Sequence, residues 1–94
     1  MNKYIVEFLG TLALSFVIFA TGNYLAIGST LALIVAIGGP ISSGAFNPAI
    51  AVALYSASDR NVRTPKDLAI YIAVQILGAV AGFYGYKQYM KSGK

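Results

Sequence analysis

The sequence of 94 residues contains no cysteine and no histidine, and few of its side chains are charged. Disulfide bonds, thiol chemistry, imidazole catalysis and Cys/His metal sites are therefore excluded. Charged residues make up 11% of the chain, compared with about a quarter in an ordinary soluble domain. Hydrophobic residues make up 57%, and the mean hydropathy is +0.69. We therefore expect an integral membrane protein of unassigned source membrane, not an enzyme, and no cofactor or metal.

Two long runs of the sequence lack Asp, Glu, Lys and Arg, namely residues 8–58 and 68–86. A helix rises about 1.5 Å per residue, so about 20 apolar residues cross a bilayer. Segments at about residues 4–21, 24–40 and 66–88 meet this length and predict three transmembrane helices. The positive charges lie at the chain ends or in one linker, where membrane proteins meet headgroups. This distribution forms no basic stripe for nucleic acid.

The first apolar segment has an alternative interpretation as a signal peptide. Lys3 would supply the basic region and residues 8–19 the apolar core. Glu7 at the edge of the segment argues against this interpretation, as do the equally apolar segments that follow.

A fourth apolar segment, residues 50–55, is too short to cross the membrane. Counted from Asn47 it gives about 13 Å of helix, less than half of a hydrocarbon core about 30 Å thick. Backbone rich in Gly and Pro precedes it, and such backbone is tolerated at membrane depth only where it lines a cavity or is buried by protein. Residues 41–55 are therefore predicted to form a re-entrant loop and half-helix. The predicted fold class is an all-α membrane protein, a single unit over residues 1–94.

Small residues recur at helical spacing in two of the predicted spans. Such residues allow close approach of helix backbones in lipid, although a chain rich in Gly and Ala also produces these spacings by chance. The predicted packing residues are Gly28, Ala32 and Ala36 in the second span and Gly78 and Gly82 in the last. In the last span, Tyr71 and Gln75 lie on the same stripe as the two glycines.

Three motifs occur in a defined order along the chain. The first is Glu7-Phe8-Leu9-Gly10-Thr11. The second covers residues 39–49 and ends with Asn47-Pro48-Ala49, and the third is Gln75-x-x-Gly78-x-x-x-Gly82. Together they resemble the aquaporin and glycerol-channel family, also called major intrinsic proteins. Members of that family contain two inverted repeats, each with two spans, a re-entrant Asn-Pro-Ala loop and a third span. This chain resembles one such half-length repeat.

The resemblance implies roles for individual residues. The expected pore residues are Phe46, Asn47, Pro48, Ala49 and Ile50, and the residues expected to brace the loop are Glu7, Gly44 and Gln75. Asn47 would donate its amide hydrogens to a passing oxygen beside a helix dipole equivalent to about half a positive charge, which repels cations. A role as a simple helix N-cap is compatible with that function.

Two of these residues keep alternative interpretations. Glu7 could instead form a proton- or cation-coupled site, or lie at the interface about one turn inside the membrane. Gln75 could bond a loop carbonyl or simply hold helices together. Thr11, one turn from Glu7, is expected to satisfy carbonyls of its own helix.

The chain also departs from the family pattern, because Phe46 and Ile50 stand where the family's repeats carry a His or an Arg. We therefore expect a channel subunit for water or small uncharged solutes such as glycerol, less selective than a strict water channel. One repeat supplies one half-helix, so an inverted partner or second copy, as a homodimer or a tetramer of dimers, is expected to complete the pore. The alternatives are a non-conducting structural or assembly protein and a small dual-topology antiporter that uses Glu7.

Overall fold

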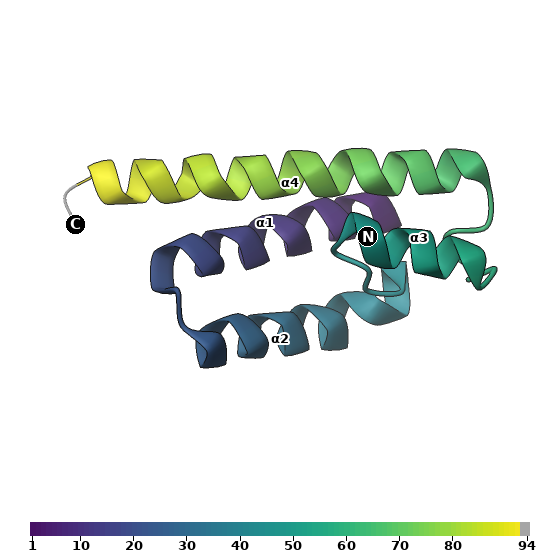
Figure 1. The fold of residues 1–94 in the computed structure, drawn as a ribbon, viewed down its shortest axis with the longest axis horizontal. Coiled ribbons are helices and arrows are strands. Elements are labelled where there is room, and N and C mark those ends of the chain that lie inside the picture. Colours follow the sequence, from purple (N-terminus) through teal and green to yellow (C-terminus); the bar gives the residue numbers. More distant parts are fainter. Residues whose placement is uncertain (93–94) are drawn as a thin grey trace.

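The computed structural model describes residues 1–92, which form four helices (Figure 1). They are α1 (Lys3–Thr21), α2 (Tyr24–Ser42), α3 (Pro48–Ser56) and α4 (Pro65–Lys91). Helices α1, α2 and α4 are long and apolar enough to cross a membrane. The predicted fold class of three spans and one short helix is therefore confirmed.

Polar side chains set where the helices begin, because each satisfies an amide of the first turn that has no partner inside its helix. Asn23 accepts from Ala26 N at 2.9 Å, and Asn2 caps α1 in the same way. Thr64 and Asp67 form a reciprocal capping box at the start of α4, with Pro65 in the first turn. These caps explain why short connections suffice between apolar helices.

Helix α2 ends later than the sequence suggested. The second span was predicted to end near residue 40, but the helix passes through Pro40 and ends at Ser42. A proline inside a helix removes one backbone hydrogen bond and crowds the carbonyl four residues earlier. Pro40 lies in the last turn of α2, so only the two residues after it continue the helix. The helix is closed by Ser43 in a left-handed conformation with φ 71°, whose N–H donates to Gly39 O at 2.8 Å.

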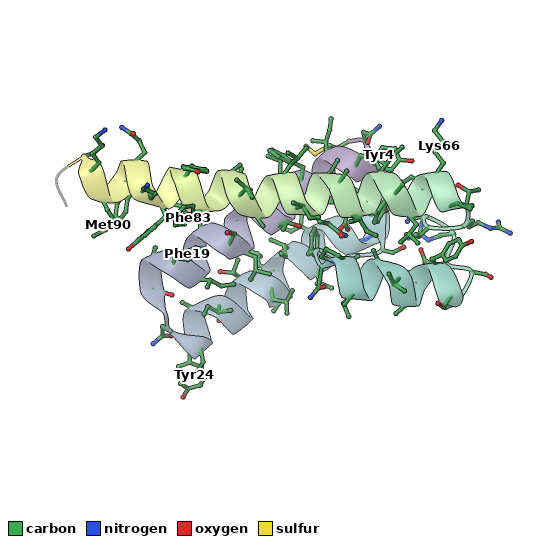
Figure 2. The ribbon with its side chains drawn as sticks, turned by 45° about the horizontal axis from the view of Figure 1, so that its top comes forward. Tyr4, Phe19, Tyr24, Lys66, Phe83 and Met90 are labelled. Atoms are coloured by element: carbon green, nitrogen blue, oxygen red, sulfur yellow. The ribbon has the colours of Figure 1, made fainter. Side chains whose placement is uncertain are left out.

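Figure 1 shows that α1 and α4 run in the same direction and that α2 runs opposite to them. One end of the bundle, the linker end, holds the start of α1, the end of α2 and the connection of residues 57–64. After α2 the chain turns back into the bundle, and α3 then runs out to the linker end again. In Figure 2, Tyr4 and Lys66 lie at the linker end, opposite Tyr24 and Met90.

Helices α1 and α4 are in backbone contact through glycine. A Cβ added to Gly78 would come within 2.5 Å of the Phe8 carbonyl oxygen, and one added to Gly82 within 2.5 Å of the Leu12 carbonyl oxygen. Any larger side chain would therefore push the two helices apart. Near the far end the Phe19 and Phe83 rings extend this contact, with centroids 5.1 Å apart (Figure 2).

The small-residue stripe on α2 behaves differently. Gly28, Ala32 and Ala36 are all exposed, and a Cβ added to Gly28 would meet nothing within 4 Å. The stripe makes no helix contact within the described chain. Its predicted use in helix packing remains a prediction.

Candidate functional site

The centre of the site is the Glu7 carboxylate, which is 0% exposed. Its Oε1 accepts hydrogen bonds from Phe46 N at 2.7 Å and Gln75 Nε2 at 2.8 Å. Its Oε2 accepts from Ser42 Oγ at 2.7 Å and Ala45 N at 3.1 Å. A buried charge is tolerated only when it is hydrogen-bonded, and here four donors from the loop, α2 and α4 surround it.

The loop between α2 and α3 has an unusual backbone. Ser43, Gly44 and Phe46 have positive φ values of 71°, 68° and 53°. Glycine adopts this conformation without steric cost, whereas a bulky residue such as Phe rarely does. Strained residues persist only where the surroundings over-determine them. The hydrogen bond from Phe46 N to Glu7 supplies part of that constraint.

The side chain of Phe46 supplies the rest. Its residue is 2% exposed, and the ring lies against Gly10 of α1 and Gly38 of α2. A Cβ added to Gly10 would collide with the ring, and one added to Gly38 would come within 3.1 Å of Phe46 Cζ and 2.7 Å of Val6 Cγ1. The ring thus anchors the loop between two spans. Phe46 also lines the groove beyond α3, so its expected place in the pore stays a prediction.

Helix α3 begins at Asn47, whose Oδ1 accepts from Ala49 N at 2.7 Å. Pro48 occupies the first turn, and Ala51 N donates to Asn47 O at 2.9 Å. Asn47 is exposed, and within residues 1–92 its amide nitrogen makes no hydrogen bond. Ile50, which is 47% exposed, lies one turn further along α3. The N-terminal end of α3 therefore presents the free NH₂ group of Asn47 on an exposed surface.

A groove of about 400 Å³ opens beyond the first turn of α3, between α1 and α4. Asn47 and Pro48 lie at its α3 end, and its walls include Thr11 to Ile18 of α1 and Gln75 to Val80 of α4. Thr11 and Gln75 stand near the middle of their helices. The first turn of α3 therefore lies at about half the depth of the bundle. Every lining residue is uncharged.

Two buried polar atoms beside this groove have no hydrogen-bond partner in the described chain: Thr11 Oγ1 and Gln75 Oε1. The expectation that the Thr11 hydroxyl bonds carbonyls of its own helix is therefore not met in this geometry. The sequence allows Gln75 either to bond a loop carbonyl or to hold helices together. In the structure its amide donates to the Glu7 carboxylate and to no loop carbonyl.

Two residues of the site were not identified from the sequence. The Tyr71 hydroxyl donates to Ser42 O at 2.7 Å, and both residues are 0% exposed. This bond joins the Ser42 carbonyl at the end of α2 to α4. Without it the carbonyl would be buried without a hydrogen-bond partner. Tyr71 shares a helix stripe with Gln75, and that was the available signal. Nothing distinguishes Ser42 from its neighbour Ser43 in the sequence.

A second polar cluster covers the linker end of the loop. Asp59 Oδ2 accepts from Ser43 Oγ at 2.7 Å and from Asn61 N at 3.0 Å, and Asn61 Nδ2 donates to Ser43 Oγ at 2.9 Å. Partial burial works against ionisation of Asp59, but these hydrogen bonds and the Arg60 charge outweigh it and lower its pKa below the usual value. The cluster fixes the linker beneath the strained loop. Within residues 1–92 no group of three or more acidic side chains could hold a metal ion.

Comparisons with known proteins agree with this geometry. The family described as "MIP: Major intrinsic protein" matches residues 22–93. The glycerol uptake facilitator protein-like 6 of Lactiplantibacillus plantarum is 36% identical over 98% of this chain and 45% of its own length. Aquaglyceroporin AqpS of Rhizobium meliloti is 40% identical over 64% of this chain and 24% of its own. Aquaporin NIP3-1 of Arabidopsis thaliana is 35% identical over 90% of this chain and 28% of its own length.

The chain thus spans less than half the length of these relatives. No solved structure gives a significant match. Three apolar spans, a short helix that starts at Pro48 and a family match over most of the sequence agree with one another. The chain therefore belongs to the major intrinsic protein family, the multi-pass membrane channels that include aquaporins and glycerol facilitators.

Proposed function

We propose that this chain is a subunit of a membrane channel for passive passage of water or small uncharged solutes such as glycerol. The observation that carries the proposal is the first turn of α3, which lies at about half the depth of the bundle with an exposed Asn47 at its tip. A helix that starts inside the membrane is tolerated where it lines a cavity. The relatives whose names refer to glycerol and water channels support the same function.

The mechanism follows from the charges at this turn. The free amide of Asn47 donates hydrogen bonds to an oxygen, and the α3 dipole adds about half a positive charge at the same point. A cation is repelled, whereas a neutral hydroxyl or water binds weakly and passes on. Asn47, Pro48, Ala49 and Ile50 are the proposed pore residues. Ile50 makes the wall apolar, so few groups compete with the permeating molecule.

We further propose that an inverted second copy completes the pore. The groove beyond α3 runs from Thr11 to Ile18 along α1, or about 10 Å. An α3 of nine residues is about 13 Å long and uncharged, as the groove is. An inverted copy could therefore lay its half-helix in this groove, with the two Asn47 tips facing each other. The positive ends of both dipoles would then meet around a water oxygen, and this opposes proton passage.

The two alternative functions, an antiporter and a non-conducting scaffold, require different properties of Glu7 and of the tip of α3. An antiporter would need Glu7 to exchange protons with water, but its carboxylate is fully buried and engaged by four donors. A non-conducting scaffold is compatible with the fold. A scaffold would be insensitive to charge at the tip of α3, whereas a channel would not.

Osmotic shrinkage of vesicles containing the purified protein tests the channel proposal. We expect faster shrinkage than in empty vesicles and a changed permeability in Asn47→Asp, because the new carboxylate cancels the positive potential in the pore. Asn23→Asp is the matched control, since Asn23 is also an exposed N-cap but lies outside the groove. Asp is a good N-cap, so both variants retain the cap. Shrinkage equal to that of empty vesicles would refute the channel.

Orientation of the chains tests the inverted copy separately. Lys3, Arg60, Arg63 and Lys66 belong to the linker end, whereas Lys87 and Lys91 lie in the last turns of α4 and Lys94 follows it in the sequence. This bias of four to three is weak under the positive-inside rule, so both orientations are permitted. Cysteines introduced by Ser58→Cys and Ser92→Cys should each be labelled from both sides of sealed membranes. Labelling of each from one side only would exclude the inverted copy and require a different inverted partner.

A further inference from the structure

A second groove lies between α1 and α2, on a different face of α1 from the groove beyond α3. It has a volume of about 300 Å³ and is lined only by apolar residues, among them Val6, Leu9, Leu33, Ile37 and Ile41. Leu33 to Ile41 covers about 12 Å along α2. One leaflet of the hydrocarbon core is about 15 Å deep. The groove therefore extends from the linker end to about the middle of the membrane.

A cation lies near the linker end of this groove, close to the lining residue Ile41 but not itself among the lining residues. Arg60 is exposed, and its Nη2 donates to the Pro40 carbonyl at 3.1 Å, one residue from Ile41. Within residues 1–92 the one ion pair closer than 4 Å joins Lys3 and Asp67. The Arg60 charge helps to lower the pKa of the neighbouring Asp59, but the two side chains make no ion pair within 4 Å, and Asp59 Oδ2 accepts from Ser43 and Asn61. Most of the guanidinium N–H groups of Arg60 are thus free, in the planar fork that binds phosphate well.

We infer that this groove binds one acyl chain of an anionic phospholipid, with the headgroup phosphate on Arg60. An apolar slot one leaflet deep with a free guanidinium at headgroup level complements an amphiphile that has a tail and a negative head. A helix of another chain would fill the slot but would not need the cation. Of the expected pore residues the site includes only Phe46, and it does not depend on solute passage.

Fluorescence quenching by brominated lipid tests this site, because the chain contains no tryptophan. Ile37→Trp places a reporter at a lining position of the groove where the native side chain is 67% exposed. The protein is reconstituted in phosphatidylcholine vesicles with acyl-brominated phosphatidylglycerol or acyl-brominated phosphatidylcholine. We expect about fivefold tighter binding of the anionic lipid, which corresponds to about 1 kcal/mol per basic side chain at the surface.

Arg60→Gln in the reporter background should abolish this preference, and Arg60→Lys should keep part of it. Arg63→Gln is the matched control, since Arg63 is an exposed linker cation with no bond to α2, and it should leave the ratio unchanged. Leu77→Trp, at a 61% exposed position of α4 outside the groove, should show equal quenching by both lipids. Equal quenching at position 37, or a preference that survives Arg60→Gln, would overturn the site. Absence of quenching by either lipid would show that protein fills the groove, which also overturns it.

Discussion

The substitution Glu7→Gln removes one acceptor from the centre of the site with little change of volume. Each carboxylate oxygen accepts one backbone N–H of the loop, Phe46 N at Oε1 and Ala45 N at Oε2. An amide keeps one oxygen and replaces the other by NH₂, which only donates. Whichever way the amide turns, one loop N–H faces another donor. Ser42 can adapt, because its hydroxyl is able to accept as well as donate.

The expected cost follows from these bonds. A buried donor left without a partner costs about 1–3 kcal/mol, and each hydrogen bond to a charged group contributes about 1.5–3 kcal/mol. The lower desolvation cost of a neutral amide offsets part of this loss. We therefore expect the loop to lose about 2–4 kcal/mol of local stability. Opening of the loop then becomes about 30- to 700-fold more frequent, at tenfold per 1.4 kcal/mol.

Amide hydrogen exchange at Ala45 and Phe46 measures this opening directly. Exchange at both positions should accelerate about 30- to 700-fold in Glu7→Gln. Ser15→Ala is the control, because it removes a bond of 2.7 Å between α1 and Ala79 O that does not touch the loop. Ala45 and Phe46 should exchange at the unmodified rate in the control. Unchanged exchange in Glu7→Gln would refute the argument that this carboxylate holds the loop.

Three further predictions concern packing and the linker. Gly10→Ala drives a methyl group into the Phe46 ring and should destabilise the fold by about 1–3 kcal/mol in thermal unfolding, whereas Gly28→Ala, with nothing within 4 Å, should change it by less than about 1 kcal/mol. Gly78→Ala should lower the melting temperature through contact with the Phe8 carbonyl, whereas Gly85→Ala, whose nearest neighbour is 3.8 Å away, should not. Because the folded pKa of Asp59 is lowered, its stabilisation is present above the ordinary value of 3.8 and is lost as the pH falls through the folded pKa. Exchange at Asn61 should therefore rise below pH 3.8, and Asp59→Asn should abolish that pH dependence.

The spans were predictable because their signal is local. Length and hydropathy of a continuous segment determine whether a helix can cross a bilayer, and α1, α2 and α4 each carry the whole signal themselves. The half-helix was predictable for the opposite reason, since nine residues cannot cross. The end of α2 was less predictable, because a proline such as Pro40 usually marks a helix end. In the structure the helix continues to Ser42 and is capped by Ser43.

The detailed geometry of the site depends on contacts between distant residues. The direction of the Phe46 ring is set by two gaps, at Gly10 and Gly38, that come together only after α1 and α2 pack. The partner of Ser42 O is Tyr71, 29 residues away. No local pattern encodes either contact. Motif order indicated which residues belong to the loop, but it did not indicate which side chains point inward.

The structure separates the buried residues that support the loop from the exposed residues in the first turn of α3 that are proposed to meet a solute. Glu7, Gln75 and Tyr71 are fully buried, and their bonds hold the loop and the end of α2. Asn47 and Ile50 are exposed and support nothing beyond the first turn of α3. Substitution of a support residue should therefore alter exchange and stability before permeability. Asn47→Asp, which keeps the N-cap of α3, and substitutions of Ile50 should alter permeability at unchanged stability. Unfolding of the loop in either variant would contradict this division.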